Sequence, residues 1–134
     1  RDLKCQNIFL TTKDECKIGD FGISKIMEET FDLARTKIGT PFCMAPEIWD
    51  GLPYNQKSDV WSLGCILYEL CTLKHPFIAS STHPNYLDAP SYMLKITSGK
   101  YEPIKGNYSE DIKDLVAELL NKEPQHRPSV QKIL

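Results

Sequence analysis

The sequence has no long apolar run. Its longest apolar segment is interrupted by Glu69, so no stretch reaches the roughly 18 to 20 apolar residues of a membrane-spanning helix. The first residues, Arg-Asp, offer no basic start followed by an apolar run, as a secretory signal would. No charge dominates either: 16 Lys and Arg against 18 Asp and Glu give a net charge of −2, which indicates no general affinity for nucleic acid or a membrane. With 41% hydrophobic and 25% charged residues over 134 positions, the composition is typical of one soluble globular domain.

Paired cysteines are also lacking. The five cysteines are odd in number and contain no C-x-x-C pair. We therefore expect no metal or disulfide framework and expect a reducing compartment, which makes the protein intracellular and cytoplasmic. Cys43 could be a reactive thiol in a substrate-facing loop, although ordinary packing is the commoner role. The histidines have no partners at metal-binding spacing and are predicted to be surface or capping residues: His75, His83 and His126.

A glycine-rich loop that could cover nucleotide phosphates is missing too. The sequence contains no G-x-G-x-x-G and no V-A-I-K strand whose Lys could pair with a helical Glu. It also begins without Met. We therefore expect the chain to be a piece of a longer protein.

What is present is a group of polar residues in two short pieces. R-D-L-K-C-Q-N occupies positions 1–7, and D-F-G occupies positions 20–22. Phosphoryl transfer uses a carboxylate that receives the substrate hydroxyl, a cation near the moving phosphate, and oxygen ligands for Mg²⁺. Four residues have these groups in that order: Asp2, Lys4, Asn7 and Asp20.

Together with A-P-E at 45–47, these pieces resemble the eukaryotic protein-kinase motifs H-R-D-L-x-x-x-N, D-F-G and A-P-E. The resemblance implies that Asp2 is the catalytic base, that Lys4 binds phosphate, and that Asn7 and Asp20 bind Mg²⁺. It also implies ATP and Mg²⁺ as cofactors and proteins as substrates. The plain alternative is that Asp2 and Asp20 are ordinary loop carboxylates, but it does not explain three motifs in this order.

The same resemblance gives roles to residues further along the chain. Residues 23–43 would form an activation segment, in which Thr36 is the candidate phosphorylation site and Arg1 its charged partner. A solvated loop threonine is the alternative for Thr36. Thr40 would bond to the catalytic Asp and Lys and so belong to the catalytic group.

Three structural residues also follow from the resemblance. Arg127 would form a buried pair with Glu47, where a fork-shaped guanidinium binds a carboxylate through two bonds. The alternative is a lone surface arginine. Asp59 would accept backbone N–H bonds from the catalytic loop, and it could equally cap its own helix.

Hydrophobic periodicity predicts one hairpin and several helices. Two short apolar runs, 8–10 and 16–18, flank a polar turn and indicate the hairpin. It would fix Asn7 at one end and deliver Asp20 at the other. A buried helix follows, with Ser58 as its N-cap and apolar residues almost all round.

The C-terminal half reads as loops and helices in turn. Residues 78–91 are polar, contain two prolines and are predicted to be a loop. A short helix over 92–96 should end at Gly99. Ser109 begins an amphipathic packing helix that ends before Pro124, and a last helical stretch leads to Leu134. A partner-binding role is the alternative for the apolar stripe of the amphipathic helix.

Within the kinases, three stretches resemble the NIMA-related Ser/Thr branch: 34–41, 65–77 and 98–104. The implied fold is mainly α, the C-terminal lobe of a protein kinase with a small β-hairpin and without the N-terminal lobe, so that 1–134 is a partial kinase domain. We expect the parent protein to phosphorylate Ser or Thr and the isolated chain to be inactive. The alternative is a non-catalytic scaffold or binding piece derived from a kinase fold.

Overall fold

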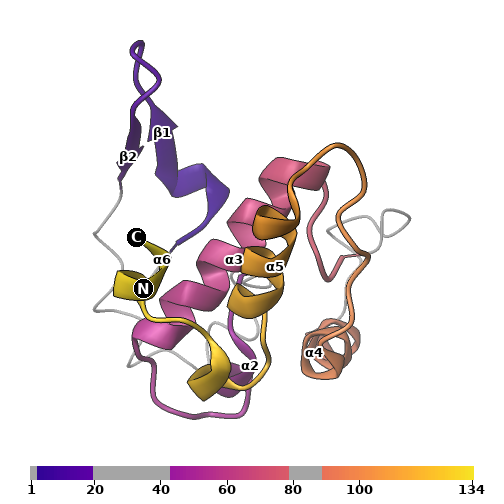
Figure 1. Ribbon diagram of the computed structural model, residues 1–134. Coiled ribbons are helices and arrows are strands. Elements are labelled where there is room, and N and C mark those ends of the chain that lie inside the picture. The colour runs from indigo at the N-terminus through magenta and orange to yellow at the C-terminus, as the bar shows by residue number, and fades with distance from the viewer. Residues whose placement is uncertain (1–2, 20–42, 79–88) are drawn as a thin grey trace.

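The long helix α3, Gln56–Thr72, runs through the middle of the molecule, and the other helices lie around it (Figure 1). Helix α5, Glu110–Leu119, packs along α3, while α2, Pro46–Trp49, contacts α4, Ala89–Ser98. This arrangement confirms the mainly α fold. The computed structural model describes residues 3–19, 43–78 and 89–134.

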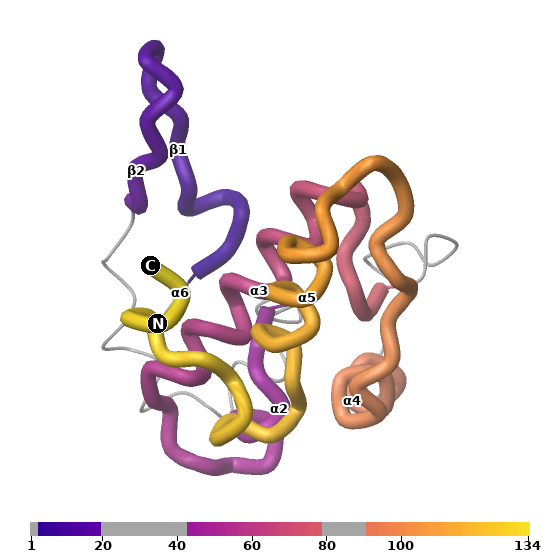
Figure 2. Tube along the Cα trace, in the orientation of Figure 1, coloured from indigo at the N-terminus to yellow at the C-terminus, as the bar shows by residue number. Residues whose placement is uncertain are grey.

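The predicted hairpin is present and projects from the helical body (Figure 2). Strands β1, Ile8–Leu10, and β2, Cys16–Ile18, are antiparallel, with Ile8 opposite Ile18. The turn between them closes when the N–H of Thr11 donates to the carbonyl of Glu15 at 2.9 Å.

The N-cap of helix α3 lies three residues before the predicted one, Ser58. Asn55 is the cap, and its side-chain oxygen accepts from the N–H of Lys57 at 2.7 Å. The Ser58 hydroxyl accepts from the N–H of Asn55 in return, at 3.4 Å, which makes a reciprocal cap. The prediction that Ser58 is the N-cap was wrong, because its hydroxyl also has a tertiary role. It donates to Glu47 Oε1 at 2.9 Å.

Helix α4 also differs from its prediction. It starts at Ala89, inside the predicted loop 78–91, and ends at Ser98, just before Gly99 with φ +64°. Proline is compatible with the first turn of a helix, where its missing N–H is not needed, so Pro90 did not mark a loop. Residues 79–88 lie outside the described residues.

The C-terminal elements follow the sequence pattern closely. Ser109 caps α5 and accepts from the N–H of Ile112 at 3.4 Å, as predicted. A 3₁₀ turn, η4 (Pro124–His126), separates α5 from the last helix, α6 (Val130–Ile133). The apolar stripe of α5 packs inward, with Leu119 fully buried, which supports its packing role.

The core is centred on α3. Trp61 is fully buried and its ring stacks on Phe77, with centroids 5.3 Å apart and planes within 5°. Helix α3 is not buried on every side, however, because Leu70 is 65% exposed. Among the described residues, no helix is both long and apolar enough to cross a membrane.

Arg127 connects four segments of this core. Its Nη1 and Nη2 donate to the two carboxylate oxygens of Glu47, each at 2.8 Å. Its remaining N–H groups donate to the backbone carbonyls of Lys57, Asn121 and Lys122, at 2.8, 2.7 and 3.1 Å. All five N–H groups of the guanidinium are therefore used, which is the condition under which a buried charge is tolerated.

The other partner of the pair, Glu47, is 4% exposed. Burial by itself would raise the pKa of this carboxyl, but hydrogen bonds from Arg127, a backbone N–H and Ser58 outweigh it, so the pKa lies below its ordinary value of 4.5. The carboxylate is therefore the form that the folded chain stabilises.

Gly64 allows α3 and α5 to approach closely. A Cβ at this position would lie 2.8 Å from Cβ of Leu119 and 2.9 Å from Cδ2 of Leu120. Real Cβ contacts of this length do not occur, so any larger residue must push the two helices apart.

We predict that Gly64→Ala destabilises the protein. Alanine would add about 1 kcal/mol of helix propensity, but overpacking costs about 1–3 kcal/mol, so we expect a net loss of up to about 2 kcal/mol in guanidinium unfolding. Leu120→Ala should partly relieve the clash, so the double variant should lose less stability than the two single variants added together. If the stability losses of the two single variants simply add in the double variant, the strain does not arise from the contact between position 64 and Leu120.

The buried pair should be far more important than an exposed one. Arg127→Met leaves Glu47 charged and buried, and we expect a loss of about 3–5 kcal/mol in unfolding free energy. The matched control is Lys132→Met, which removes an exposed pair with Glu118 at 3.4 Å and should cost under about 1 kcal/mol. Equal losses in the two variants would refute this ranking.

The pair should also make stability depend on acid pH. Because the folded-state pKa of Glu47 is depressed, its contribution is complete above the unfolded value near 4.5 and is lost as pH falls through the lower folded value. The difference in unfolding free energy between the native protein and Glu47→Gln should therefore shrink below about pH 4.5. Urea titrations between pH 7 and pH 3 measure this difference in unfolding free energy. A difference that stays constant over this range would contradict the lowered pKa of Glu47.

Candidate active site

The segment that carries the first candidate residues is a tight turn at the base of the hairpin. Lys4 is extended, with φ −156°, and directly precedes the 3₁₀ turn η1, Cys5–Asn7. The N–H of Asn7 donates to the carbonyl of Lys4 at 3.0 Å, which closes the turn. Asn7 is only 5% exposed, so the candidate metal ligand belongs to the packed part of the chain.

The hairpin brings the far end of its second strand back to Asn7. The N–H of Gly19 donates to the carbonyl of Asn7 at 2.9 Å, one step beyond the pairing of Ile8 with Ile18. The two ends of the hairpin are therefore adjacent, as the sequence predicts. Gly19 is the last described residue before position 43, and it precedes Asp20 in the sequence.

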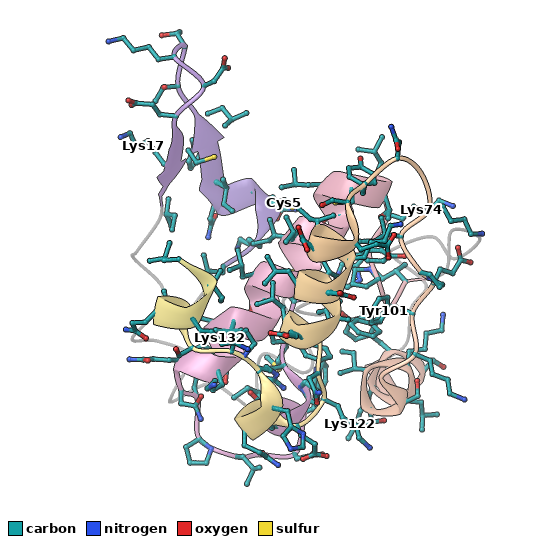
Figure 3. All side chains as sticks on the ribbon, in the orientation of Figure 1. Cys5, Lys17, Lys74, Tyr101, Lys122 and Lys132 are labelled. Atoms are coloured by element: carbon teal, nitrogen blue, oxygen red, sulfur yellow. The ribbon has the colours of Figure 1, made fainter. Side chains whose placement is uncertain are left out.

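A contact that the sequence did not predict attaches this turn to α3. The Cys5 thiol donates to Oε2 of Glu69 at 3.2 Å, and Figure 3 shows Cys5 directed towards α3. Burial first, and then this bond to the carboxylate, raise the pKa of Cys5 to about 12, so the residue remains a thiol donor at neutral pH. No local pattern marks a pair that lies 64 positions apart in the sequence.

Several candidate residues lie outside the described residues. They are the catalytic base, the second metal ligand, the activation phosphosite with its charged partner, and the substrate-side threonine: Asp2, Asp20, Thr36, Arg1 and Thr40. Their roles stay predictions.

Asp59 lies in the first turn of α3, where a carboxylate suits the positive end of the helix dipole. The Tyr54 hydroxyl donates to its Oδ1. The predicted bonds from residues 1 and 2 to this carboxylate fall outside the described residues. The N-cap of α3 is Asn55 and not Asp59, so Asp59 places a negative charge in the first turn rather than at the cap position.

The remaining two candidates, Glu47 and Arg127, form the bidentate ion pair that the resemblance implied, at 2.8 Å. They lie 80 positions apart, and both are almost fully buried, so the lone-arginine alternative is wrong. Their role is structural: they join α2 to the segment that follows α5.

One cluster in the described residues was not expected. The sulfurs of Cys43 and Cys65 and a ring nitrogen of His75 all lie within 4.8 Å of one another. The interpretation of His75 as isolated was therefore wrong. Sequence spacing could not reveal the cluster, because its members are 22 and 10 positions apart and meet only through the path of α3 (65 − 43 = 22, 75 − 65 = 10).

The turn at η1 thus carries both the side-chain amide of Asn7 and the ammonium group of Lys4, and the bond from Cys5 to Glu69 attaches this turn to α3. Asn7 has the oxygen ligand type that Mg²⁺ accepts, and Lys4 has the positive charge that suits a phosphate. The described part of the site thus fits the donor set of a phosphate and magnesium site.

Comparison with known proteins agrees with this fold. The family model for the protein kinase domain matches residues 1–134. The chain is 48% identical over 134 residues to "Serine/threonine-protein kinase Nek1" of Mus musculus and 46% identical to "Serine/threonine-protein kinase Nek3" of the same species. It is 43% identical to "Serine/threonine-protein kinase Nek2" of Homo sapiens.

All of this chain is covered in each comparison, but the chain spans only 11%, 25% and 28% of the length of these three relatives. The similarity therefore concerns one part of these relatives. With the whole chain matched and the relatives so similar, the chain belongs to the protein kinase family, among the serine/threonine kinases of the NIMA-related branch.

Proposed function

We propose that this chain contributes the catalytic loop of an enzyme that transfers the γ-phosphoryl group of ATP to Ser or Thr hydroxyls of protein substrates, with Mg²⁺. The observation that supports it best is the bond from the Gly19 N–H to the carbonyl of Asn7 at 2.9 Å. Asp20 is joined to Gly19 by one peptide bond. The two proposed metal ligands thus belong to neighbouring ends of one hairpin rather than to distant regions.

The proposed chemistry consists mainly of positioning. Asp2 would orient the substrate hydroxyl and accept its proton, and Lys4 would stabilise negative charge on the transferred phosphoryl group. Asn7 and Asp20 would hold Mg²⁺, which in bound form neutralises charge on the phosphate oxygens. The attachment of Cys5 to Glu69 keeps the Lys4–Asn7 turn against α3, so these groups would not need to be ordered during the reaction.

The choice of Ser and Thr as acceptors is supported by Lys4, because tyrosine kinases usually carry Ala or Arg elsewhere in this loop. In this proposal Thr40 assists Asp2 and Lys4, and phosphorylation at Thr36, paired with Arg1, activates the enzyme. The five free cysteines suit a reducing, intracellular and cytoplasmic location. Protein substrates and ATP are the proposed partners, with no role for nucleic acid or membrane.

We also propose that residues 1–134 are inactive by themselves. They include no glycine-rich loop and no V-A-I-K strand, which cover and hold the phosphates of ATP in kinases. Activity then depends on segments encoded outside this sequence.

The test is a kinase assay on the protein produced from the complete coding sequence. With radiolabelled ATP, Mg²⁺ and a library of Ser and Thr peptides, we expect phosphate transfer that needs Mg²⁺. Asp20→Asn removes one ligand charge with little change in size, and we expect a loss of about 100-fold or more in rate. Asn7→Ala should lower the rate and raise the Mg²⁺ concentration needed for half-maximal activity.

The control for Asn7→Ala is Asn107→Ala, at an exposed position, which should leave the rate unchanged. Because Asn7 is buried, melting temperatures of all variants are measured in parallel to separate lost chemistry from lost folding. No transfer by the complete protein, or transfer unaffected by Asp20→Asn, would favour the alternative of a non-catalytic binding piece. Transfer by residues 1–134 alone would refute their proposed inactivity.

A further inference from the structure

The cluster of Cys43, Cys65 and His75 has no role in the proposed phosphoryl transfer. Its members come from the segment before α2, the middle of α3 and the segment after α3. The two sulfurs and a ring nitrogen lie within 4.8 Å of one another. Cys65 is fully buried, whereas Cys43 is partly exposed, so only one of the two thiols can be reached from solvent.

The backbone fixes the proton on the His75 ring. Its Nδ1 accepts from the N–H of Phe77 at 3.2 Å, so a neutral ring carries its proton on Nε2. A ring nitrogen of His75 lies within 4.8 Å of the Cys43 sulfur, so the imidazole acts on the charge of that sulfur at short range. The imidazole therefore stabilises a thiolate at Cys43.

The same geometry argues against a metal ion. A histidine that binds a metal through one nitrogen donates the proton on its other nitrogen to an acceptor. Here the other nitrogen, Nδ1, faces the backbone N–H of Phe77, which is itself a donor. If Nε2 bound a metal, the ring proton would move to Nδ1, and this N–H would face the N–H of Phe77. The cluster is therefore better suited to thiol chemistry.

Charges around the cluster favour one thiolate beside one thiol. The neighbouring Cys65 side chain, and then His75, outweigh burial and the nearby Glu69 carboxylate and lower the pKa of Cys43 to about 6. Burial, followed by the neighbouring Cys43 thiolate, raises the pKa of Cys65 well above its ordinary value. At pH 7 Cys43 is therefore mainly a thiolate, which is the nucleophilic form, and Cys65 remains a protonated thiol.

Groups from other elements do not reverse this balance. Cys5 from η1 remains neutral, because its pKa is raised to about 12. Tyr92 from α4, whose ring lies 6.0 Å from that of His75, has a raised pKa as well, through burial first. Arg127 lowers the pKa of Cys65 only as the smallest of the contributions.

We propose that Cys43 and Cys65 form a reversible oxidation site, in which a peroxide oxidises the sulfur of Cys43, the partly exposed one of the two, and Cys65 then closes a disulfide with it. The site is separate from the residues of phosphoryl transfer, so it holds whether or not the proposed function does.

The chemistry balances in two steps. The Cys43 thiolate attacks one oxygen of hydrogen peroxide, the O–O bond breaks, and sulfenic acid and hydroxide form while the sulfur loses two electrons. The Cys65 sulfur then attacks the Cys43 sulfur, the S–O bond breaks, and the Cys65 proton leaves with the departing oxygen as water.

The geometry requires only a small movement. A disulfide has a sulfur separation of about 2.05 Å, so sulfurs already within 4.8 Å must approach by at most about 2.8 Å. The Ser62 hydroxyl donates to the carbonyl of Cys43 at 2.9 Å, which holds this residue against α3 near Cys65. The bond would attach the chain just before α2 to the middle of α3.

The test uses the reduced protein from the complete coding sequence. It is exposed to hydrogen peroxide from one to ten equivalents, blocked with iodoacetamide, and digested without reductant for mass spectrometry. We expect a peptide pair joined through Cys43 and Cys65 to form first and to disappear with dithiothreitol. Cys16→Ser, at an exposed cysteine, and Cys71→Ser are matched controls that should not change its yield.

Two variants separate the steps. Cys43→Ser should abolish the joined peptides, and Cys65→Ser should stop the reaction at a sulfenic acid on Cys43 that dimedone labels. The half-point of Cys43 alkylation by iodoacetamide should lie near pH 6. His75→Gln should move it upward, and a shift of one pH unit slows alkylation at pH 6 about fivefold.

Clear outcomes would overturn the proposal. They are oxidation of Cys43 no faster than that of Cys16 in the folded protein, or oxidation that never yields a bond to Cys65. Retention of one equivalent of Zn²⁺ that blocks alkylation of both cysteines would show a metal site instead. Melting temperatures of each variant, compared with the reduced protein, establish that the loss of a signal reflects chemistry and not unfolding.

Discussion

The guanidinium of Arg127 is the interaction on which the described structure depends most. It lies in the core with all five N–H groups donating: two to Glu47 and one each to three backbone carbonyls. A cation buried in this way is stable only because none of its donors is left unpaired. Its centre also lies 5.0 Å from the ring centroid of Trp61, which adds an attraction between cation and aromatic face. Helix α2, the start of α3 and the chain after α5 therefore share one charge, and none of them is held by apolar packing alone.

Helix α3 carries this support to the candidate site. At its first turn it is held by the ion pair, along its middle it packs on α5 through Gly64, and near its end Glu69 accepts from Cys5. The turn that bears Lys4 and Asn7 is thus attached to a helix that is itself fixed at several points (Figure 1). Catalytic groups on a loop are positioned well only when the scaffold below them is rigid, and here the scaffold is the long central helix that carries the fully buried Trp61.

The sequence predicted those features that have a local or motif-based cause. The Ser109 cap, the apolar stripe of α5 and the hairpin arise from neighbouring residues, and the Glu47–Arg127 pair followed from motif resemblance. The remaining features depend on contacts that no local rule describes. The α3 cap moved to Asn55 because tertiary structure uses the Ser58 hydroxyl, and Cys5–Glu69 joins residues 64 positions apart. The Cys43, Cys65 and His75 cluster arises only once α3 sets the distance between its neighbours.

Two serines one helical turn apart explain why the chain before α3 follows it so closely. Ser58 donates to Glu47 and accepts from Asn55, while Ser62 donates to the carbonyl of Cys43 at 2.9 Å. Residues four apart lie on the same face of a helix, so both hydroxyls point towards the segment from 43 to 47. Alanine would fit the space and favour the helix, but it would leave a buried carbonyl and a carboxylate oxygen with fewer donors, at a cost larger than the gain in helix propensity. The two hydroxyls thus attach the cap, the ion pair and the backbone at Cys43 to one face of α3.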